Sequence, residues 1–246
     1  MTISKLALVT GSLGLCGSAL ASPATIVNPS FEDNFASDWS YPSLVPNGWT
    51  VIDPNGIIGG GDLTGVVNPT GSTFFNSGVP DGRNAAYIYL SEQIDQGPVS
   101  LSQTLTATLQ ANTHYHFQVG VGNIAAGFSS DGNNYFDLTE FPGYMVQVLA
   151  NGVVLAEDFN SLSIPDSEFG TSVLDFDTGA SDPQLGQAIE IRLTNLNMRS
   201  SAQHPGVEVD FDMAQMDASP VPEPGTLAVA GVGLAGLLFK RRRTHA

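Results

Sequence analysis

Residues capable of chemistry are common in this 246-residue chain, but none form a known catalytic pattern. The sequence contains no Gly-x-Ser-x-Gly elbow, no His-Glu-x-x-His pair and no phosphate-binding loop. Two carboxylates can hydrolyse a glycosidic bond, but with 24 Asp and Glu residues such pairs arise by chance. We therefore expect a non-catalytic protein, with a polysaccharide-active enzyme as a distant alternative.

Two aromatic residues lie in a polar stretch where a ligand could reach them. Trp39 and Tyr41 belong to the sequence Asp-Trp-Ser-Tyr, which has the composition of a loop. The apolar face of a sugar ring suits an aromatic surface, so we expect these two side chains either to stack on a glycan or to anchor the loop. Trp49 follows a turn-forming Asn-Gly pair and is predicted to be a core residue.

The distribution of charge excludes one class of partner. Lys5 lies near the N-terminus and four cations lie near the C-terminus, so residues 22–217 contain only three arginines against 23 carboxylates. Their net charge of about −20 would repel the phosphates of nucleic acid. We therefore expect no nucleic-acid partner.

The first 21 residues have the pattern of a secretory signal peptide. Lys5 supplies the positive start, an apolar stretch follows, and Ala19-Leu20-Ala21 is a small-x-small cleavage pattern. The only cysteine, Cys16, lies inside this leader, so the mature chain would have neither a disulfide nor a thiol nucleophile. The sequence thus predicts an exported domain over residues 22–217.

That domain has the pattern of an all-β fold. Apolar and polar residues alternate with period two, which buries one face of a strand. The predicted strands are 85–90, 99–109, 114–121, 144–150, 153–157, 188–194 and 207–213. Asn151-Gly152 predicts a type I′ hairpin turn because both positions accept positive φ. We predict a two-sheet antiparallel jelly-roll sandwich, followed by a short hydrophobic helix near the C-terminus.

Short motifs across this region resemble a known fold family. The stretch Asn28-Pro-Ser-Phe-Glu32, the pair Gly48-Trp49 and the closing Phe211-Asp212-Met213 resemble motifs of galactose-binding-like jelly rolls, including many carbohydrate-binding modules. The core stretches Leu101-Ser-Gln-Thr-Leu and Asn112-Thr-His-Tyr-His-Phe add to this resemblance. Met213 departs from it, because the family usually has a polar residue there.

The resemblance also implies a structural calcium ion. In such folds the first and last strands lie together, and a Glu from one and an Asp from the other often bind Ca²⁺. Glu32 and Asp212 occupy these positions, and Asp210 is a further candidate because it shares the strand face of Asp212. Ca²⁺ prefers several hard oxygen ligands, and an acidic chain gains by neutralising its clustered carboxylates. The alternative is that these acids are solvated strand ends.

The last 29 residues have the composition of a linker and a sorting signal. Residues 218–221 form a Pro-containing linker, and Pro222, Glu223 and Pro224 precede a short apolar run. The run of 14 residues is shorter than the roughly 20 that a membrane-spanning helix needs. The basic residues that follow it would stay on the cytoplasmic side; they are Lys240, Arg241, Arg242 and Arg243.

These three features, in this order at the end of the chain, resemble the PEP-CTERM sorting signal. The resemblance implies export across the inner membrane of a Gram-negative bacterium, a temporary anchor in that membrane, and processing by a membrane-embedded exosortase. The rival interpretation is an uncut C-terminal anchor. We expect a protein of the cell surface or extracellular matrix that binds exopolysaccharide, or else an acidic structural protein of the matrix without specific glycan binding.

Overall fold

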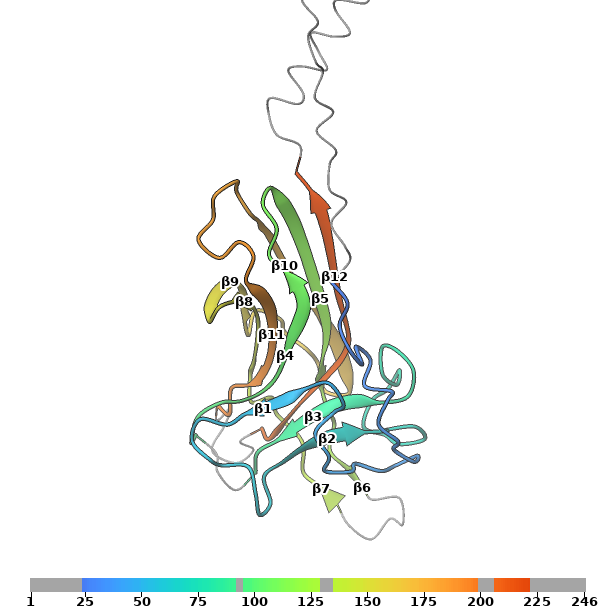
Figure 1. The fold of residues 1–246 in the computed structure, drawn as a ribbon. Helices are drawn as coiled ribbons and strands as arrows, with labels where there is room; N and C mark the ends of the chain where they lie inside the picture. The colour runs from blue at the N-terminus through green and yellow to red at the C-terminus, as the bar shows by residue number, and fades with distance from the viewer. Residues whose placement is uncertain (1–23, 92–94, 129–134, 199–205, 222–246) are drawn as a thin grey trace, which may run out of the picture.

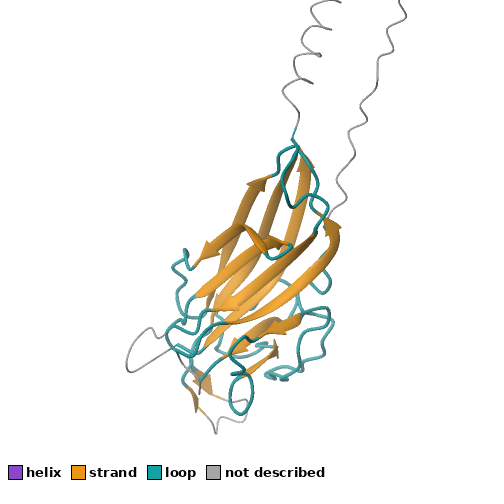
Figure 2. Cartoon of the chain, turned by 60° about the vertical axis from the view of Figure 1, so that its left-hand side comes forward, coloured by secondary structure: helices purple, strands orange, loops and turns teal. Residues whose placement is uncertain are grey.

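The computed structural model describes residues 24–91, 95–128, 135–198 and 206–221, and two antiparallel β-sheets dominate them (Figures 1 and 2). None of these residues is helical, and no helix among them could cross a membrane. The fold class is therefore as predicted for a jelly-roll sandwich. The signal peptide, the apolar run and the basic cluster lie outside the described residues.

The first sheet has the strand order β1-β4-β11-β8-β9. Its strands are β1 (Thr50–Ile52), β4 (Val99–Thr108), β11 (Ala188–Asn195), β8 (Tyr144–Ala150) and β9 (Val153–Phe159). The β8–β9 hairpin confirms the predicted turn, because Asn151 and Gly152 have φ angles of 51° and 75°. Both values lie in the left-handed region that a type I′ turn requires.

The second sheet has the order β10-β5-β12-β3-β2. Its strands are β10 (Glu168–Asp177), β5 (Thr113–Asn123), β12 (Glu208–Pro220), β3 (Ala85–Tyr89) and β2 (Leu63–Val67). A separate small pair is formed by β6 (Gly127–Phe128) and β7 (Tyr135–Phe136). In Figure 1 the long strand β12 runs beside β5 and reaches β3 at the lower end of the molecule.

Each face of the second sheet has its own apolar contacts. Residues of the inner face, such as Val121, Val209 and Phe211, join the main core between the two sheets. The outer face carries two smaller apolar clusters, around Phe74 and around Tyr87. The segments 68–84, 124–128 and 135–141 supply side chains to these clusters, so one end of the outer face is covered rather than solvated.

Two segments differ from the sequence prediction. Residues 24–32 contain turns instead of a first strand, because Asn28 and Phe31 have positive φ angles (50° and 59°) that an extended strand excludes. The segment still lies against the closing strand, where the N–H of Ala214 donates to the carbonyl of Pro29 (2.9 Å). β12 continues to Pro220 beside Thr113, so three residues of the predicted linker are strand residues.

Candidate active site

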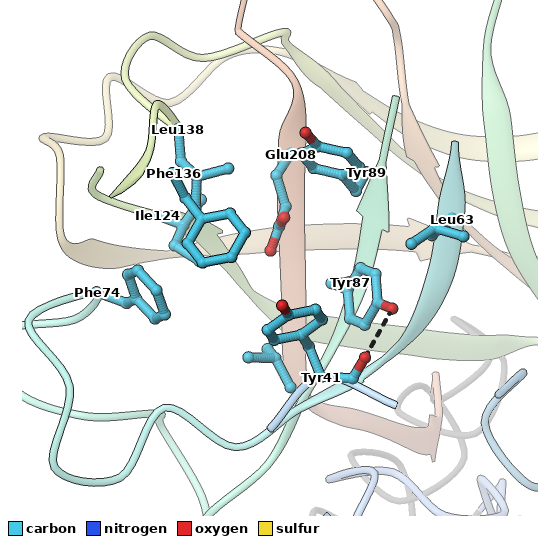
Figure 3. A pocket seen from close by; sticks show the side chains of 10 residues that line it. Tyr41, Leu63, Phe74, Tyr87, Tyr89, Ile124, Phe136, Leu138 and Glu208 are labelled. Carbon is cyan, nitrogen blue, oxygen red and sulfur yellow. Dashed lines mark hydrogen bonds between the residues drawn. The ribbon is translucent and has the colours of Figure 1, made fainter. Parts of the chain in front are cut away.

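A cavity of about 140 Å³ lies on the covered outer face of the second sheet. Strands β2, β3 and β12 form its floor, and side chains from four loop segments and β7 surround it (Figure 3). Aromatic and aliphatic side chains make up nearly all of the lining, with Glu208 as its one ionisable carboxyl group. The lining residues are Tyr41, Leu63, Val67, Phe74, Tyr87, Tyr89, Ile124, Phe136, Leu138 and Glu208.

Glu208 is the first residue of β12 and lies opposite Tyr89 in the ladder with β3. Its side chain projects between the loop-side ring of Phe136 and the strand-side ring of Tyr87 (Figure 3). Only 7% of the residue is exposed, and this burial raises the pKa of its carboxyl to about 8. Glu208 is therefore mainly protonated at neutral pH and can donate a proton inside the cavity.

Asp210, a predicted calcium ligand, lies beside Glu208 on β12. It shares the outer face of β12 and is fully buried, opposite Tyr87 on β3 and Gly122 on β5. Burial, and then the charge of Glu208, raise the pKa of Asp210 well above its usual value. A carboxyl group with a raised pKa must lose its proton before it can bind Ca²⁺.

Tyr87 connects the cavity floor to the N-terminal loop. Its hydroxyl donates to the carbonyl of Tyr41 (3.2 Å), as the dashed line in Figure 3 shows. Burial, and then the nearby Glu208, raise the pKa of Tyr87 far above its usual value, so the phenol stays a hydrogen-bond donor. The Tyr41 segment is thereby held at the edge of the cavity.

The structure does bring Glu32 and Asp212 together, through the loop 80–84. The N–H groups of Arg83 and Asn84 donate to Glu32 Oε1 (2.7 Å each), and the N–H of Asp81 donates to Asp212 Oδ2 (2.8 Å). Burial, with smaller contributions from the charges of Asp81 and Glu32, raises the pKa of Asp212 to about 8. Hard oxygen ligands therefore converge here, although the described residues include no group of three or more side chains arranged to hold a metal ion.

The two aromatic residues predicted to contact a ligand lie beside the cavity. Tyr41 lines it and forms an edge contact with Phe136 (ring centroids 5.8 Å apart), while Trp39 contacts Phe74 (6.0 Å). Trp49 is buried in the main core against Phe31, as predicted. These ring contacts agree with the loop-anchoring alternative for Trp39 and Tyr41, while stacking on a glycan stays a prediction.

Sequence reasoning missed Glu208 and the cavity. The available signal was the stretch Glu-Val-Asp-Phe-Asp at 208–212, which places three acids on one strand face. Such a face normally meets solvent, and only the loops packed over it turn it into a buried site.

Comparisons with known proteins bear on this cavity. The family model described as HpiC1 cyclase matches residues 22–217. The Stig cyclase Fisc from Fischerella sp. TAU, in complex with (3Z)-3-(1-methyl-2-pyrrolidinylidene)-3H-indole, is 35% identical, with a TM-score of 0.72 over 81% of this chain and 98% of that chain. A cyclase from the same source, in complex with 4-(1H-indol-3-yl)butan-2-one, is also 35% identical (TM-score 0.72; 82% and 100% covered).

Two other comparisons carry no evidence about the activity. A search of curated proteins found no match. A carbohydrate-binding module, TmCBM61 in complex with β-1,4-galactotriose, is a distant match at 14% identity and a TM-score of 0.43, covering 80% of this chain and 99% of that chain. This likeness carries no argument for glycan binding.

The cyclase comparisons correct the expectation of a non-catalytic protein, which was wrong. It rested on the missing catalytic motifs, but a single buried acid has no sequence signature of that kind. The comparisons point to a cyclase enzyme.

The C-terminal prediction is confirmed at the level of sorting. A PEP-CTERM protein-sorting motif matches residues 220–243, which include the Pro-Glu-Pro triplet and the basic cluster. The chain is therefore exported and processed by an exosortase, with a cell-surface or extracellular location in a Gram-negative bacterium.

Proposed function

The chain belongs to the HpiC1-like cyclase family, and we propose that it closes a ring in an apolar, aromatic substrate by acid catalysis. The observation that carries this proposal is the protonated Glu208 carboxyl in a cavity walled by aromatic rings. A carboxyl group with a pKa near the working pH is an efficient proton donor. Indole compounds occupy two of the related cyclases, which supports an aromatic substrate here.

The proposed reaction needs no co-reactant. Glu208 donates its proton to a double bond of the substrate, which leaves a cationic carbon. A carbon of the substrate's aromatic ring attacks that cation and forms the new carbon–carbon bond. The ring then loses a proton to the Glu208 carboxylate, which restores the acid and leaves a product that is an isomer of the substrate.

The cavity walls favour this course in two ways. The faces of Tyr41, Tyr89 and Phe136 stabilise a cationic carbon by cation–π interaction, which contributes about 2 kcal/mol in a desolvated site. The same side chains exclude water, which would otherwise capture the cation and give an alcohol. Tyr87 lines the cavity floor as a neutral phenol.

An isomerisation assay tests the proposal. Indoles that carry an alkenyl side chain are incubated with the purified domain, and products of unchanged mass are separated by chromatography. We expect Glu208→Gln to lower turnover by about 100-fold or more, the usual contribution of a general acid. Glu157→Gln, on the exposed strand β9, is the matched control and should keep wild-type turnover. Wild-type turnover by the Glu208→Gln variant would refute the acid role.

A structural calcium ion at Glu32 and Asp212 is a separate part of the proposal. It is supported by the convergence of these two carboxylates, and of Asp81, on one loop. Bound Ca²⁺ would neutralise the buried Asp212 and stabilise the domain. It would also tie the N-terminal segment to β12 at a distance from the cavity acid.

A further inference from the structure

The cavity is too small for the whole of such a substrate. Its volume is about 140 Å³, close to the roughly 150 Å³ of an apolar protein cavity that binds benzene. Cyclisation joins two parts of one molecule, so a substrate has more atoms than one ring. Resting on the proposed function, we infer that the substrate has two parts: a reacting ring in the cavity, and a second uncharged apolar group in an open groove beside Tyr41.

The groove adjoins the cavity through shared side chains. It is lined by Phe35, Ser37, Trp39, Ser40, Tyr41 and Pro42, with a volume of about 460 Å³. Tyr41 lines both sites. Trp39 of the groove contacts Phe74 of the cavity (6.0 Å), and Tyr41 contacts Phe136 (5.8 Å). The two sites are therefore neighbours, and a ligand bound at one lies close to the other across Tyr41.

The backbone holds the groove in a fixed shape. Trp39 has a φ of 65°, a strained value for a bulky side chain. Its N–H donates to the carbonyl of Asn68 (2.9 Å), and the N–H of Asn68 donates to the carbonyl of Ser40 (2.9 Å). The Tyr87 hydroxyl bonds the carbonyl of Tyr41 as well. Strain that is held in place by several bonds is typical of binding sites.

The chemistry of the lining selects the class of group. Phe35 is 89% exposed, more than any other large hydrophobic residue in the described part of the chain. The lining contains no charged side chain, and the Ser40 hydroxyl is already bonded to the carbonyl of Ser37 (2.7 Å). An exposed ring beside a half-buried tryptophan favours a flat, apolar and uncharged group.

The two tryptophans of the chain allow a direct test. Trp39 borders the groove, whereas Trp49 is buried in the main core. A ligand-induced change in tryptophan fluorescence that is absent in Trp39→Phe therefore reports on the groove. The exported domain is titrated with indole and with 3-(2-phenylethyl)indole, which carries a second ring on a two-carbon linker. Phe35→Ala removes a solvent-exposed ring and should leave the fold intact.

We expect the two-ring compound to change Trp39 emission and to bind about tenfold more tightly than indole, the gain from partly burying one ring. Phe35→Ala should remove most of this gain and leave the affinity for indole unchanged. Equal affinities of the wild type for both compounds, or equal losses in Phe35→Ala, would overturn the two-part substrate while leaving the cavity as the active site. Failure of both compounds to bind would contradict the proposed function and this inference together.

Discussion

The carboxyl of Glu208 couples the proposed chemistry to the stability of the fold. Its pKa is raised to about 8 in the folded protein, whereas an exposed glutamate titrates near 4.5. Between these pH values the unfolded chain has released a proton that the folded protein still holds. Stability therefore falls as the pH rises from about 4.5 to 8, the reverse of the usual behaviour of a carboxylate in an ion pair.

Glu208→Gln should reduce this dependence on pH. Glutamine has nearly the same shape and stays neutral, so the free energy of unfolding of the variant should fall less than that of the wild type between pH 5 and pH 8.5. The expected difference is about 1 kcal/mol or more, given about 1.4 kcal/mol for each unit of pKa shift. Urea unfolding at the two pH values measures it, and parallel losses in both proteins would contradict the raised pKa.

Single residues were the least predictable part of the molecule. Trp39, Tyr41, Glu32 and Asp212 were identified from residue type and motif, and each lies in or beside a cluster of functional interest. Glu208 was missed because its burial depends on side chains such as Phe74 and Phe136, which are distant from it in sequence. Period-two patterning locates a strand face but cannot show whether a loop covers that face.

At the scale of elements, β12 supplies one acid to the cavity, Glu208, and one to the proposed calcium site, Asp212. A bulge interrupts its pairing with β5 between Asp212 and Gln215, and Met213 inside it has a φ of 54°. The N–H of Met213 donates to Asp212 Oδ1 (2.7 Å), so the bulge also holds the carboxylate of a candidate calcium ligand in place. The resembled family has Asn or Asp here, residue types that tolerate this conformation better than Met.

Met213→Asn should therefore stabilise the domain. Relief of left-handed strain contributes about 1 kcal/mol, less the packing lost with the half-buried methionine side chain. Thermal unfolding should show a rise of a few degrees in Tm. Gly152→Ala is the opposite control: no atom lies within 4 Å of its added Cβ, so its φ of 75° alone should lower stability by about 1 kcal/mol. A lower Tm for Met213→Asn would refute the strain argument.

Regular elements were predicted well because their signals are local. The alternating stretches at 85–90, 99–109, 144–150 and 188–194 all became strands close to the predicted bounds. β10 was missed because Gly170 and its acidic residues weaken the strand pattern. The opening segment was mistaken for a strand because its motif is shared with a fold family, while its positive φ angles depend on contacts with the loop 80–84 and β12.

At the scale of the whole molecule, calcium should reverse part of the dependence on pH. Bound Ca²⁺ requires an ionised Asp212, so it would lower the pKa of that group and remove its loss of stability above pH 5. We expect the Tm at pH 8 to be several degrees higher in Ca²⁺ than in EDTA, and Asp212→Asn to abolish this difference. An unchanged Tm in wild type would remove the calcium proposal.

Export and sorting predict the mass of the working enzyme. Loss of residues 1–21 and of the segment after the Pro-Glu-Pro triplet should leave a domain that ends near Pro224. Intact mass of the protein recovered from outside the cell reports both cleavages at once. A mass that still includes the C-terminal basic cluster would contradict the temporary anchor.

Exopolysaccharide binding stays a prediction, to be tested by a glycan array with and without calcium.

The position of a bound ligand tests the central claim most directly. A crystal structure of the domain with 4-(1H-indol-3-yl)butan-2-one, which occupies a related cyclase, would locate the active site. The indole ring should lie in the cavity between Tyr89 and Phe136, in contact with the Glu208 carboxyl. An indole bound elsewhere on the domain, with the cavity empty, would contradict the assignment of this cavity as the active site.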